Sequence, residues 1–459
     1  MLMRLTQWMC SSRSRDWKTP VAKCSRQQKK RPCPCYHPRD GDLEAWEWSL
    51  LRSHWTSLCS MSRRLGILRI HHCPCLLRPH RPTASGTFGS PGVRMQVCRS
   101  DRKLNERPSP TIVGTGLFAL DVVIDRGAAT AETCLGGSAG NVLAILGHLG
   151  WHTVPIGQLG YDAAATKIAN EFSRLGADTR FLTRSQHQAT PVVYQLPGKA
   201  GDTHEFSFRC PVCGRKRGYK PPVDDGTAMP QLHSLDAPDV FYFDRTTPWA
   251  LELAERYREG GTLVVFEPSA IGNDLSSFEQ AIRAAHIVKY ADDRIVEMEG
   301  VDFSAVEVEI QTQGKKGLRF RMGGAVEWHH LTAISVPYLA DTAGAGDWCT
   351  SGFLYAMLGN IFENGGRGML SVRRVRESLR FGQILSALNC MEKGARGLAR
   401  RHRSVQLVSL AASIRNTMAS SVPGRDIDVA NRSDQQRCAP TAGTTAIMSS
   451  LLCCEAFAG

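Results

Sequence analysis

Short apolar runs alternate with longer amphipathic segments through the middle of the chain, and this alternation most constrains its fold. Runs rich in Val, Ile and Phe predict strands, whereas apolar residues spaced three and four apart predict helices. The expected strands are 111–117, 153–157, 179–182, 240–243, 263–267 and 287–290, and the expected helices are 139–149, 163–175, 249–259 and 278–285. This order predicts an α/β fold in which helices cover a mainly parallel sheet. Two further β-rich runs, 192–196 and 205–209, predict a small lid sheet that would exclude water.

The basic charge of the chain is confined to its first 108 residues. They contain 21 Lys and Arg against 7 Asp and Glu, whereas residues 109–459 contain 35 and 36. The first segment also holds 8 of the 16 cysteines and 5 of the 9 tryptophans, without sustained periodicity. We therefore expect an unstructured leader at 1–108, one domain at 109–405 and a low-complexity, disordered tail at 406–459.

Three interpretations of the leader stay open. It is a basic arm for nucleic acid or membrane, an organelle-targeting peptide, or an upstream start miscall with the true beginning near Met95. Its acidic residues argue against a targeting peptide, and we favour the miscall. Because the rest of the chain is nearly neutral, we expect the core to have no nucleic-acid partner. The absence of a long apolar run argues against a membrane span, and cysteines without framework spacing fit a reducing cytoplasm.

The most informative motif is Asp-Thr-Ala-Gly-Ala-Gly-Asp at 341–347, followed by an apolar, helix-compatible run at 348–358. Gly344 and Gly346 allow positive φ and let an anion approach backbone N–H groups, which the helix dipole reinforces. Asp347 lies in the same first turn, where the dipole should keep its carboxylate ionised to accept a proton from an alcohol. The segment therefore predicts an anion hole beside a general base. An ordinary strand-to-helix turn is the alternative interpretation.

A second glycine-rich element, Gly-Gly-Ser-Ala-Gly-Asn at 136–141, opens the predicted helix 139–149. Paired glycines let the backbone approach a polyol, and the Asn141 amide offers a donor and an acceptor to hydroxyl groups. Asp121 lies just beyond the predicted strand 111–117. The order of these elements along the chain is as informative as the motifs themselves.

Together these elements resemble the PfkB, or ribokinase-like, family of carbohydrate kinases over about residues 109–405. The segment 341–347 is similar to the family's D-T-x-G-A-G-D signature, and the segment 136–141 to its G-G-x-x-x-N sugar element. The resemblance implies a ribokinase-like three-layer fold with a small β lid. It implies a base with an anion hole, namely Asp347 with Gly344, Ala345 and Gly346. It also implies three sugar-binding residues, namely Asp121, Gly137 and Asn141.

The nucleotide side of the resemblance rests on Thr-Gln-Gly-Lys-Lys-Gly at 312–317 and on the segment 389–397. The first is similar to the family's T-x-G-x-x-G element, and the second to the loop that closes the adenine side. The residues that the resemblance assigns to ATP are Thr312, Gly314, Gly317 and Asn389. Because 312–317 lies between two β-like runs, an ordinary hairpin turn is the alternative.

The sequence departs from the family where Mg²⁺ is usually placed. The family's N-x-x-E follows a strand that ends in Lys, whereas Lys289 and Tyr290 are followed here by Ala-Asp-Asp-Arg. We therefore expect the carboxylates of Asp292, Asp293 or Glu267 to take over, because oxygen ligands suit Mg²⁺.

Another departure is Cys-Pro-Val-Cys-Gly at 210–214. Two cysteines on a tight turn can bind one face of a tetrahedral zinc ion, so Cys210 and Cys213 supply half a structural Zn²⁺ site. His204, His233, Cys134 or a second subunit would have to complete it. Reduced thiols in a turn and a redox pair are the alternatives. A homodimer through the lid also stays open.

Two other nucleotide-binding classes fit the sequence less well. Residues 114–119 imitate a dinucleotide glycine motif, but the chain continues there as a strand and opens no clear helix. The chain also lacks the P-loop pattern G-x-x-x-x-G-K-[ST]. We therefore predict a carbohydrate kinase that binds a small sugar, ATP and Mg²⁺. A nucleoside kinase of the same fold and an inactive kinase-like scaffold remain the alternatives.

Overall fold

The computed structural model describes residues 109–124, 131–198, 204–223, 231–295, 298, 300–358, 370–420, 453 and 457. All of them lie in the unit Asp101–Gly459. The predictions for the leader at 1–108 fall outside the described residues. Within the described part of the chain, no helix is long and apolar enough to span a membrane.

Nine described strands form one large sheet, and neighbours from β5 to β11 are all parallel. In spatial order they are β13 (His329–Leu331), β12 (Leu318–Met322), β11 (Val308–Thr312), β10 (Ile287–Ala291), β9 (Leu263–Phe266), β8 (Val240–Phe243), β1 (Thr111–Thr115), β4 (His152–Gly160) and β5 (Leu182–Ser185). Only β12 and β13 run antiparallel to their neighbours. The prediction of a mainly parallel sheet is confirmed.

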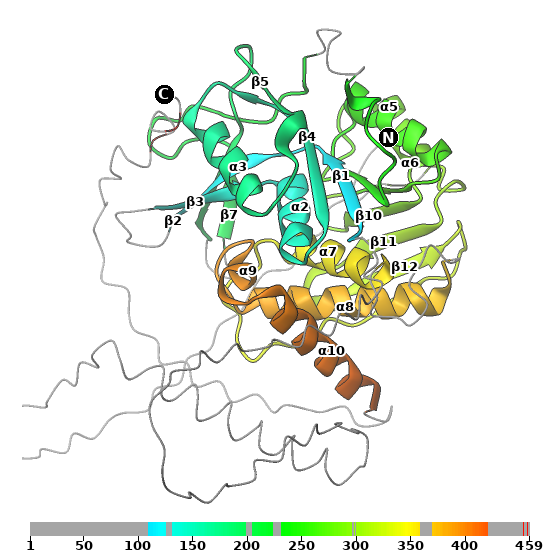
Figure 1. The fold of residues 1–459 in the computed structure, drawn as a ribbon. Coiled ribbons are helices and arrows are strands. Elements are labelled where there is room, and N and C mark those ends of the chain that lie inside the picture. Colours follow the sequence, from blue (N-terminus) through cyan, green and yellow to red (C-terminus); the bar gives the residue numbers. More distant parts are fainter. Residues whose placement is uncertain are drawn as a thin grey trace, which may run out of the picture. The chain divides into compact units, whose positions relative to one another are not determined.

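Four further strands form a separate lid sheet. Their order is β3 (Ala131–Gly136), β2 (Ala119–Ile124), β6 (Val192–Pro197) and β7 (His204–Ser207). Figure 1 shows β2, β3 and β7 together beside α3, away from the long sheet strands. Because β1 leads into β2 and not into a helix, the dinucleotide-binding interpretation of residues 114–119 is wrong.

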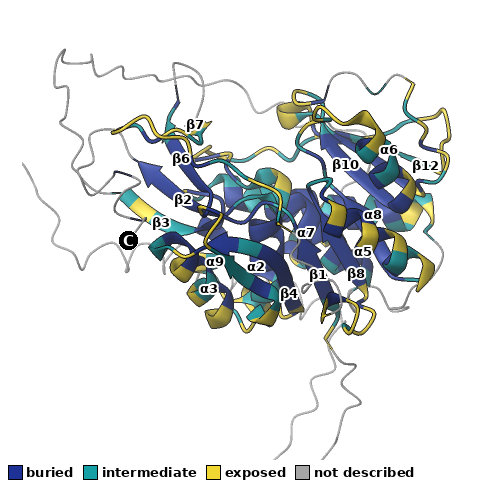
Figure 2. Ribbon diagram, turned by 90° about the horizontal axis from the view of Figure 1, so that it is seen from above, coloured by how far each residue is buried: buried dark blue, intermediate teal, exposed yellow. Residues whose placement is uncertain are grey.

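Helices cover both faces of the large sheet, as the periodicity predicts. They are α2 (Ser138–His148), α3 (Ala163–Arg174), α5 (Pro248–Glu259), α6 (Leu275–Ala284), α7 (Ala345–Leu358), α8 (Val372–Cys390), α9 (Gly397–Arg401) and α10 (Ser404–Ser420). Short 3₁₀ turns are η1 (Thr179–Phe181) and η2 (Gly314–Lys316). Figure 2 shows buried strands between helices whose outer sides are exposed.

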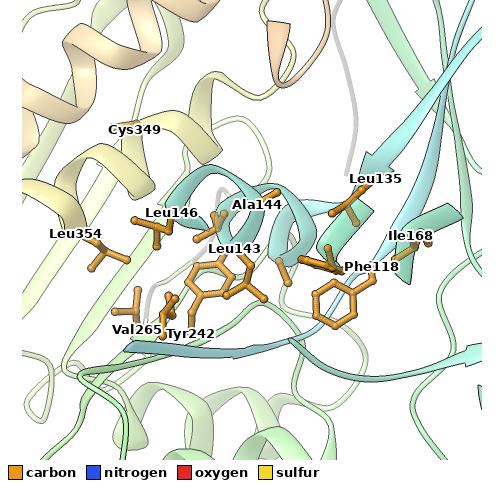
Figure 3. Packing of buried hydrophobic residues seen from close by; sticks show 14 of the residues in the cluster. Phe118, Leu135, Leu143, Ala144, Leu146, Ile168, Tyr242, Val265, Cys349 and Leu354 are labelled. Carbon is orange, nitrogen blue, oxygen red and sulfur yellow. The ribbon is translucent and has the colours of Figure 1, made fainter. Parts of the chain in front are cut away.

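The strands bury alternate residues against the two helical layers. Tyr242 and Val265 pack on the face covered by α2 and α7, where Leu143 and Leu354 meet them (Figure 3). Their neighbours, such as Phe243, point to the opposite face and pack among residues of α5 and α6. The resulting three layers hold α7, which carries the glycine-rich motif, firmly between sheet and α8.

Two predicted boundaries are wrong. The run 179–182 is not a strand, because the Asp178 carboxylate accepts a hydrogen bond from the Arg180 N–H and starts η1; β5 begins only at Leu182. The expected disordered tail at 406–459 begins inside α10, whose Leu407 and Ala411 are buried against α8 and its neighbours. The apolar face of α10 explains why a Ser- and Ala-rich segment is ordered.

Candidate active site

The motif 341–347 forms a tight turn that leads into α7. Gly344 has φ 73°, and a Cβ atom there would lie 2.4 Å from the Ala395 carbonyl oxygen. Only glycine fits this conformation and this close approach. The turn is also held from the side, because the Trp348 indole N–H donates to the same carbonyl oxygen at 3.0 Å. The shape of the turn is therefore fixed before any ligand arrives.

The turn offers fewer open donors than the sequence predicts. The Ala345 N–H donates to the Thr342 carbonyl oxygen at 3.2 Å, so the assignment of Ala345 to the anion hole is wrong for its N–H group. Among the described residues, the N–H groups of Gly344, Gly346 and Asp347 have no hydrogen-bond partner. Three open N–H groups at a helix start can bind an anion.

Asp347 occupies the first turn of α7 and faces Asn141, in the first turn of α2. The Asn141 Nδ2 atom donates to Asp347 Oδ2 at 2.8 Å. Burial, together with the negative charge of Glu267, raises the pKa of Asp347 to about 8, although the Asn141 hydrogen bond and Lys289 lower it. Burial and Glu267 thus outweigh the helix dipole, and the expectation that the dipole keeps Asp347 ionised is wrong. An acid with this pKa can both hold and accept a proton near neutral pH.

A buried network lies beneath the turn. Glu267, just after β9, pairs through Oε1 with the Lys289 ammonium of β10, which is 3% exposed. The other carboxylate oxygen accepts from the Thr350 hydroxyl of α7 at 2.6 Å and from the Tyr242 hydroxyl at 3.3 Å. Lys289 also reaches the Gly346 carbonyl oxygen at 3.4 Å. The network ties α7 to β8, β9 and β10. Its sequence signals were the lysine in the apolar run of β10 and the acid directly after β9.

Glu267 was one of three predicted Mg²⁺ ligands, and this network occupies both of its oxygens. Asp292 and Asp293, the other two, lie on the turn after β10 and are partly or fully exposed. Of the three predicted ligands, these two therefore fit the predicted role better than Glu267, because exposed carboxylates suit a hydrated Mg²⁺ ion.

The predicted sugar residues converge on the turn between β3 and α2. Asp121 of β2 is 7% exposed and packs on Gly136, where a Cβ atom would lie 1.9 Å from its Cγ. Gly137, at φ 80°, begins α2, and its carbonyl oxygen accepts from the Asn141 N–H at 2.8 Å. Asp121, Gly137, Asn141 and Asp347 therefore form a continuous row.

Two of these side chains keep an open acceptor. Among the described residues, neither Asp121 Oδ1 nor Asn141 Oδ1 has a hydrogen-bond partner, although both atoms are buried. Burial raises the pKa of Asp121 to about 7, while the positive charge of Arg396 lowers it. Buried acceptors are rarely left unsatisfied, so the row fits a ligand that carries hydroxyl groups.

Sequence reasoning missed Arg396, which lies in the segment 389–397. Its guanidinium is buried and bonds the Leu135 carbonyl oxygen and the Glu171 carboxylate of α3, both at 2.5 Å. Arg396 is thus the nearby positive charge for Asp121. The sequence shows an arginine at this position, but it could not predict the contact with Glu171, which lies more than two hundred residues earlier in the chain.

Asp341, the first residue of the motif, joins the turn to the lid. It accepts from the Ala343 N–H at 3.0 Å and the Gly394 N–H at 2.9 Å, and it contacts His204 and Gln195 of the lid strands at 2.8 and 2.6 Å. Burial alone would raise the pKa of Asp341, but these hydrogen bonds lower it to about 2. The motif therefore begins with Asp341, whose lowered pKa keeps it ionised, and ends with Asp347, whose raised pKa lets it exchange a proton near neutral pH.

The predicted nucleotide element 312–317 is the turn of the β11–β12 hairpin, as the alternative interpretation proposed. Gly317 is required there, because a Cβ atom would lie 2.1 Å from the Leu331 carbonyl oxygen. Gly314 faces open space and Thr312 ends β11, one strand away from Lys289. A hairpin turn and a nucleotide contact are compatible, because this turn lies at the same sheet edge as α7.

Asn389 is placed differently from the prediction. Its side chain is fully buried, donates to the Ala343 carbonyl oxygen at 3.0 Å and accepts from the Leu398 N–H at 3.2 Å. With no exposed surface and both amide atoms in use, Asn389 supports the turn and does not offer a nucleotide contact. Residues 389–397 brace the motif 341–347 as a whole.

No family model and no curated protein matches this sequence. Among solved structures, a fructokinase with bound ATP from Xylella fastidiosa matches with a TM-score of 0.53 and 19% identity, over 66% of this chain and 98% of that chain. An uncharacterized sugar kinase from Pyrococcus horikoshii in complex with ATP gives 0.51 and 18%, over 66% and 99%. A fructokinase double mutant from Vibrio cholerae, bound to fructose, ADP and potassium, gives 0.51 and 16%, over 66% and 99%. The described domain therefore has the ribokinase-like fold that the sequence motifs predict.

Proposed function

We propose that the protein is an ATP-dependent carbohydrate kinase of the PfkB family, which phosphorylates a hydroxyl group of a sugar or sugar-like substrate. The observation that carries this proposal is the Asn141–Asp347 hydrogen bond at 2.8 Å. It joins a row of open acceptors suited to hydroxyl groups with a helix start suited to phosphate oxygens. Donor and acceptor of a phosphoryl group would then meet at Asp347.

In this mechanism Asp347 accepts the proton of the substrate hydroxyl group while the hydroxyl oxygen bonds to the γ-phosphorus of ATP. The bond between that phosphorus and the bridging oxygen breaks, and ADP leaves with the electron pair. The N–H groups of Gly344, Gly346 and Asp347 hold the oxygens of the transferring group, where fixed donors lower the barrier. Mg²⁺, which binds with ATP and neutralises its charge, would be held near Asp292 and Asp293.

The acceptor is positioned by Asp121, Gly137 and Asn141. A carboxylate with an open oxygen accepts hydrogen bonds from hydroxyl groups of a polyol, and the Gly137 backbone permits close approach. Thr312, Gly314 and Gly317 shape the nucleotide side at the neighbouring strand ends. The lid strands β6 and β7, tied to Asp341, would keep water away from the phosphoryl group.

The test is a panel of sugars and nucleosides with the full chain, ATP and Mg²⁺, in which ADP formation and thermal stability are both measured. A sugar that raises ADP formation above the ATP-only rate, and raises the unfolding temperature, is the expected result. Turnover with nucleosides alone would favour a nucleoside kinase of the same fold. If neither nucleotide nor sugar raises the unfolding temperature, the protein is a scaffold and the proposal fails.

A further inference from the structure

Three cysteine side chains meet at the edge of the lid sheet. The sulfur atoms of Cys210, Cys213 and Cys453 all lie within 4.8 Å of one another. Cys210 and Cys453 are 2% and 7% exposed, whereas Cys213 is exposed. Two of them come from the segment after β7, and the third lies about 240 residues later in the chain. Convergence over such a sequence distance requires a tertiary arrangement that brings the sulfur atoms together.

The turn that carries Cys210 and Cys213 has a defined backbone geometry. The Cys210 N–H donates to the Arg215 carbonyl oxygen, and the Gly214 N–H donates back to the Cys210 carbonyl oxygen, both at 2.9 Å. Gly214 has φ 71°, which a side chain at that position would resist. An isolated bridge between Arg209 and Lys216 closes the turn. A closed turn with cysteines three positions apart presents two sulfur atoms to the same side, which is the spacing of structural zinc sites.

A second residue of the C-terminal segment, Phe457, also packs on the domain. Phe457 is buried in the same core cluster as Cys453 and Cys210. The Lys167 ammonium of α3 lies 5.1 Å from the centre of its ring and also donates to the Thr133 hydroxyl of β3 at 3.1 Å. The C-terminal segment therefore meets the domain at two described residues, Cys453 and Phe457.

The residues that the sequence suggested as further zinc ligands lie outside this cluster. His204 contacts Asp341, and His233 contacts Glu252 at 2.9 Å on the surface. Cys134 lies on β3, opposite Asp121. None of the three belongs to the cysteine cluster, and the third sulfur comes instead from the segment predicted to be a disordered tail.

We propose that Cys210, Cys213 and Cys453 bind one Zn²⁺ ion through their thiolates. Soft sulfur ligands select zinc over Mg²⁺ or Ca²⁺. A tetrahedral ion takes four ligands, so three thiolates leave one position for a water molecule, whereas a disulfide would use only two of the cysteines. Zinc–sulfur bonds of about 2.3 Å place sulfur atoms about 3.8 Å apart, so side-chain movements of about 1 Å complete the site. The ion would pin the C-terminal segment to the lid strand β7, whose His204 contacts Asp341.

The test is the metal content of the full chain, purified under reducing conditions without chelator. We expect Cys210→Ser, Cys213→Ser and Cys453→Ser each to contain about one zinc ion fewer per chain than the parent protein. The matched control, Cys390→Ser, lies outside the cluster and should keep the parent content. The comparison of variants corrects for zinc bound by other cysteines. Cys213→Ser is the most informative of the three variants. Its side chain is exposed, so the substitution should not disturb the core, and a loss of zinc cannot then be attributed to misfolding.

Two further readouts separate the metal from its alternatives. Added Zn²⁺ should raise the unfolding temperature of the chelator-treated parent and of Cys390→Ser, but not of Cys453→Ser. Cobalt substitution should give a thiolate-to-metal absorption band that weakens with each cysteine removed. Equal zinc in the parent and in Cys453→Ser would overturn the proposal. A mass lower by two hydrogens in the reduced preparation, which indicates a disulfide in place of the ion, would overturn it as well. None of these readouts depends on kinase activity.

Discussion

The two sheets treat buried charge in opposite ways. Under α7, on the central strands of the large sheet, Glu267 is paired with Lys289, and the Thr350 and Tyr242 hydroxyl groups donate to the other carboxylate oxygen of Glu267. In the lid sheet, Asp121 is buried to a similar degree and keeps one oxygen without a partner among the described residues. A paired buried charge fixes geometry, whereas an open one costs free energy until a ligand satisfies it. Under the proposed mechanism, the large sheet would therefore preorganise the base, and the lid sheet would recognise the sugar.

Asp347 lies between these two regions and takes a property from each. Burial and the negative charge of Glu267 raise its pKa, and Asn141, at the start of α2, donates a hydrogen bond to it. Substitutions on the two sides should therefore separate into effects on turnover and effects on substrate binding.

The largest effect is expected for Asp347→Asn. An amide cannot accept the substrate proton, so turnover should fall by about 10²- to 10⁴-fold. Steady-state ADP formation with the best sugar from the panel measures the loss, while nucleotide affinity and unfolding temperature stay near those of the parent. Asp236→Asn, an exposed acid remote from the motif, is the matched control. Unchanged turnover in Asp347→Asn would show that the large sheet does not supply the base.

Lys289→Met tests whether the large sheet depends on its buried pair. Without the ammonium, Glu267 is left as an uncompensated buried carboxylate, so we expect a loss of about 3–5 kcal/mol in the free energy of unfolding. Denaturant unfolding measures it. The double variant Lys289→Met with Glu267→Gln, which removes both charges, should recover part of the loss. If the single variant is as stable as the parent, the pair does not anchor α7.

The sequence predicted the motifs on the lid side and on the large-sheet side, but it did not predict the buried contacts that connect them. Motif spacing located Asn141 and Asp347, because each lies in the first turn of a helix that glycines precede, whereas Asp121, on β2, was located only through the family resemblance. It could not predict the Glu267–Lys289 pair or the Arg396–Glu171 contact, which depend on packing between distant segments. The pKa of Asp347 was misjudged for the same reason, since a helix start favours the anion while burial and Glu267 oppose it.

The strand and helix predictions succeeded where apolar periodicity was long and failed where a local polar contact decided. Asp178 turned a predicted strand into η1, and the apolar face of α10 ordered a segment that composition alone had assigned to a tail. Asn389 was recognised from its motif, yet its burial gives it a supporting position. A motif fixes where a residue lies more reliably than which way its side chain points.

Asp121→Asn tests the lid side of the comparison. The amide keeps the shape but removes the charge-assisted hydrogen bonds to sugar hydroxyls, each worth about 1.5–3 kcal/mol. The KM for the sugar should therefore rise roughly 10- to 100-fold, while the KM for ATP stays unchanged. Glu132→Gln, an exposed acid on the same lid sheet, is the control and should change neither constant. A rise in the KM for ATP alone would place Asp121 outside the sugar site.

Glu267→Gln tests the smallest effect, which is the electrostatic link between the network and the base. Asp347 acts as base only after losing its proton, so kcat/KM should rise with pH to a plateau with an apparent pKa of about 8. Removing the negative charge of Glu267 makes the Asp347 anion less unfavourable and lowers its pKa, so the rising limb should move to lower pH by roughly one unit.

Glu309→Gln is the control. It breaks a comparable pair, that of Glu309 with Arg321, whose charges are not among those that shift the Asp347 pKa, and it should leave the rising limb in place. Because Glu267→Gln leaves Lys289 unpaired, the profiles are compared below the unfolding temperature of both variants. A limb that stays in place in Glu267→Gln would mean that another group controls the rate, and that the two sheets do not meet electrostatically at Asp347.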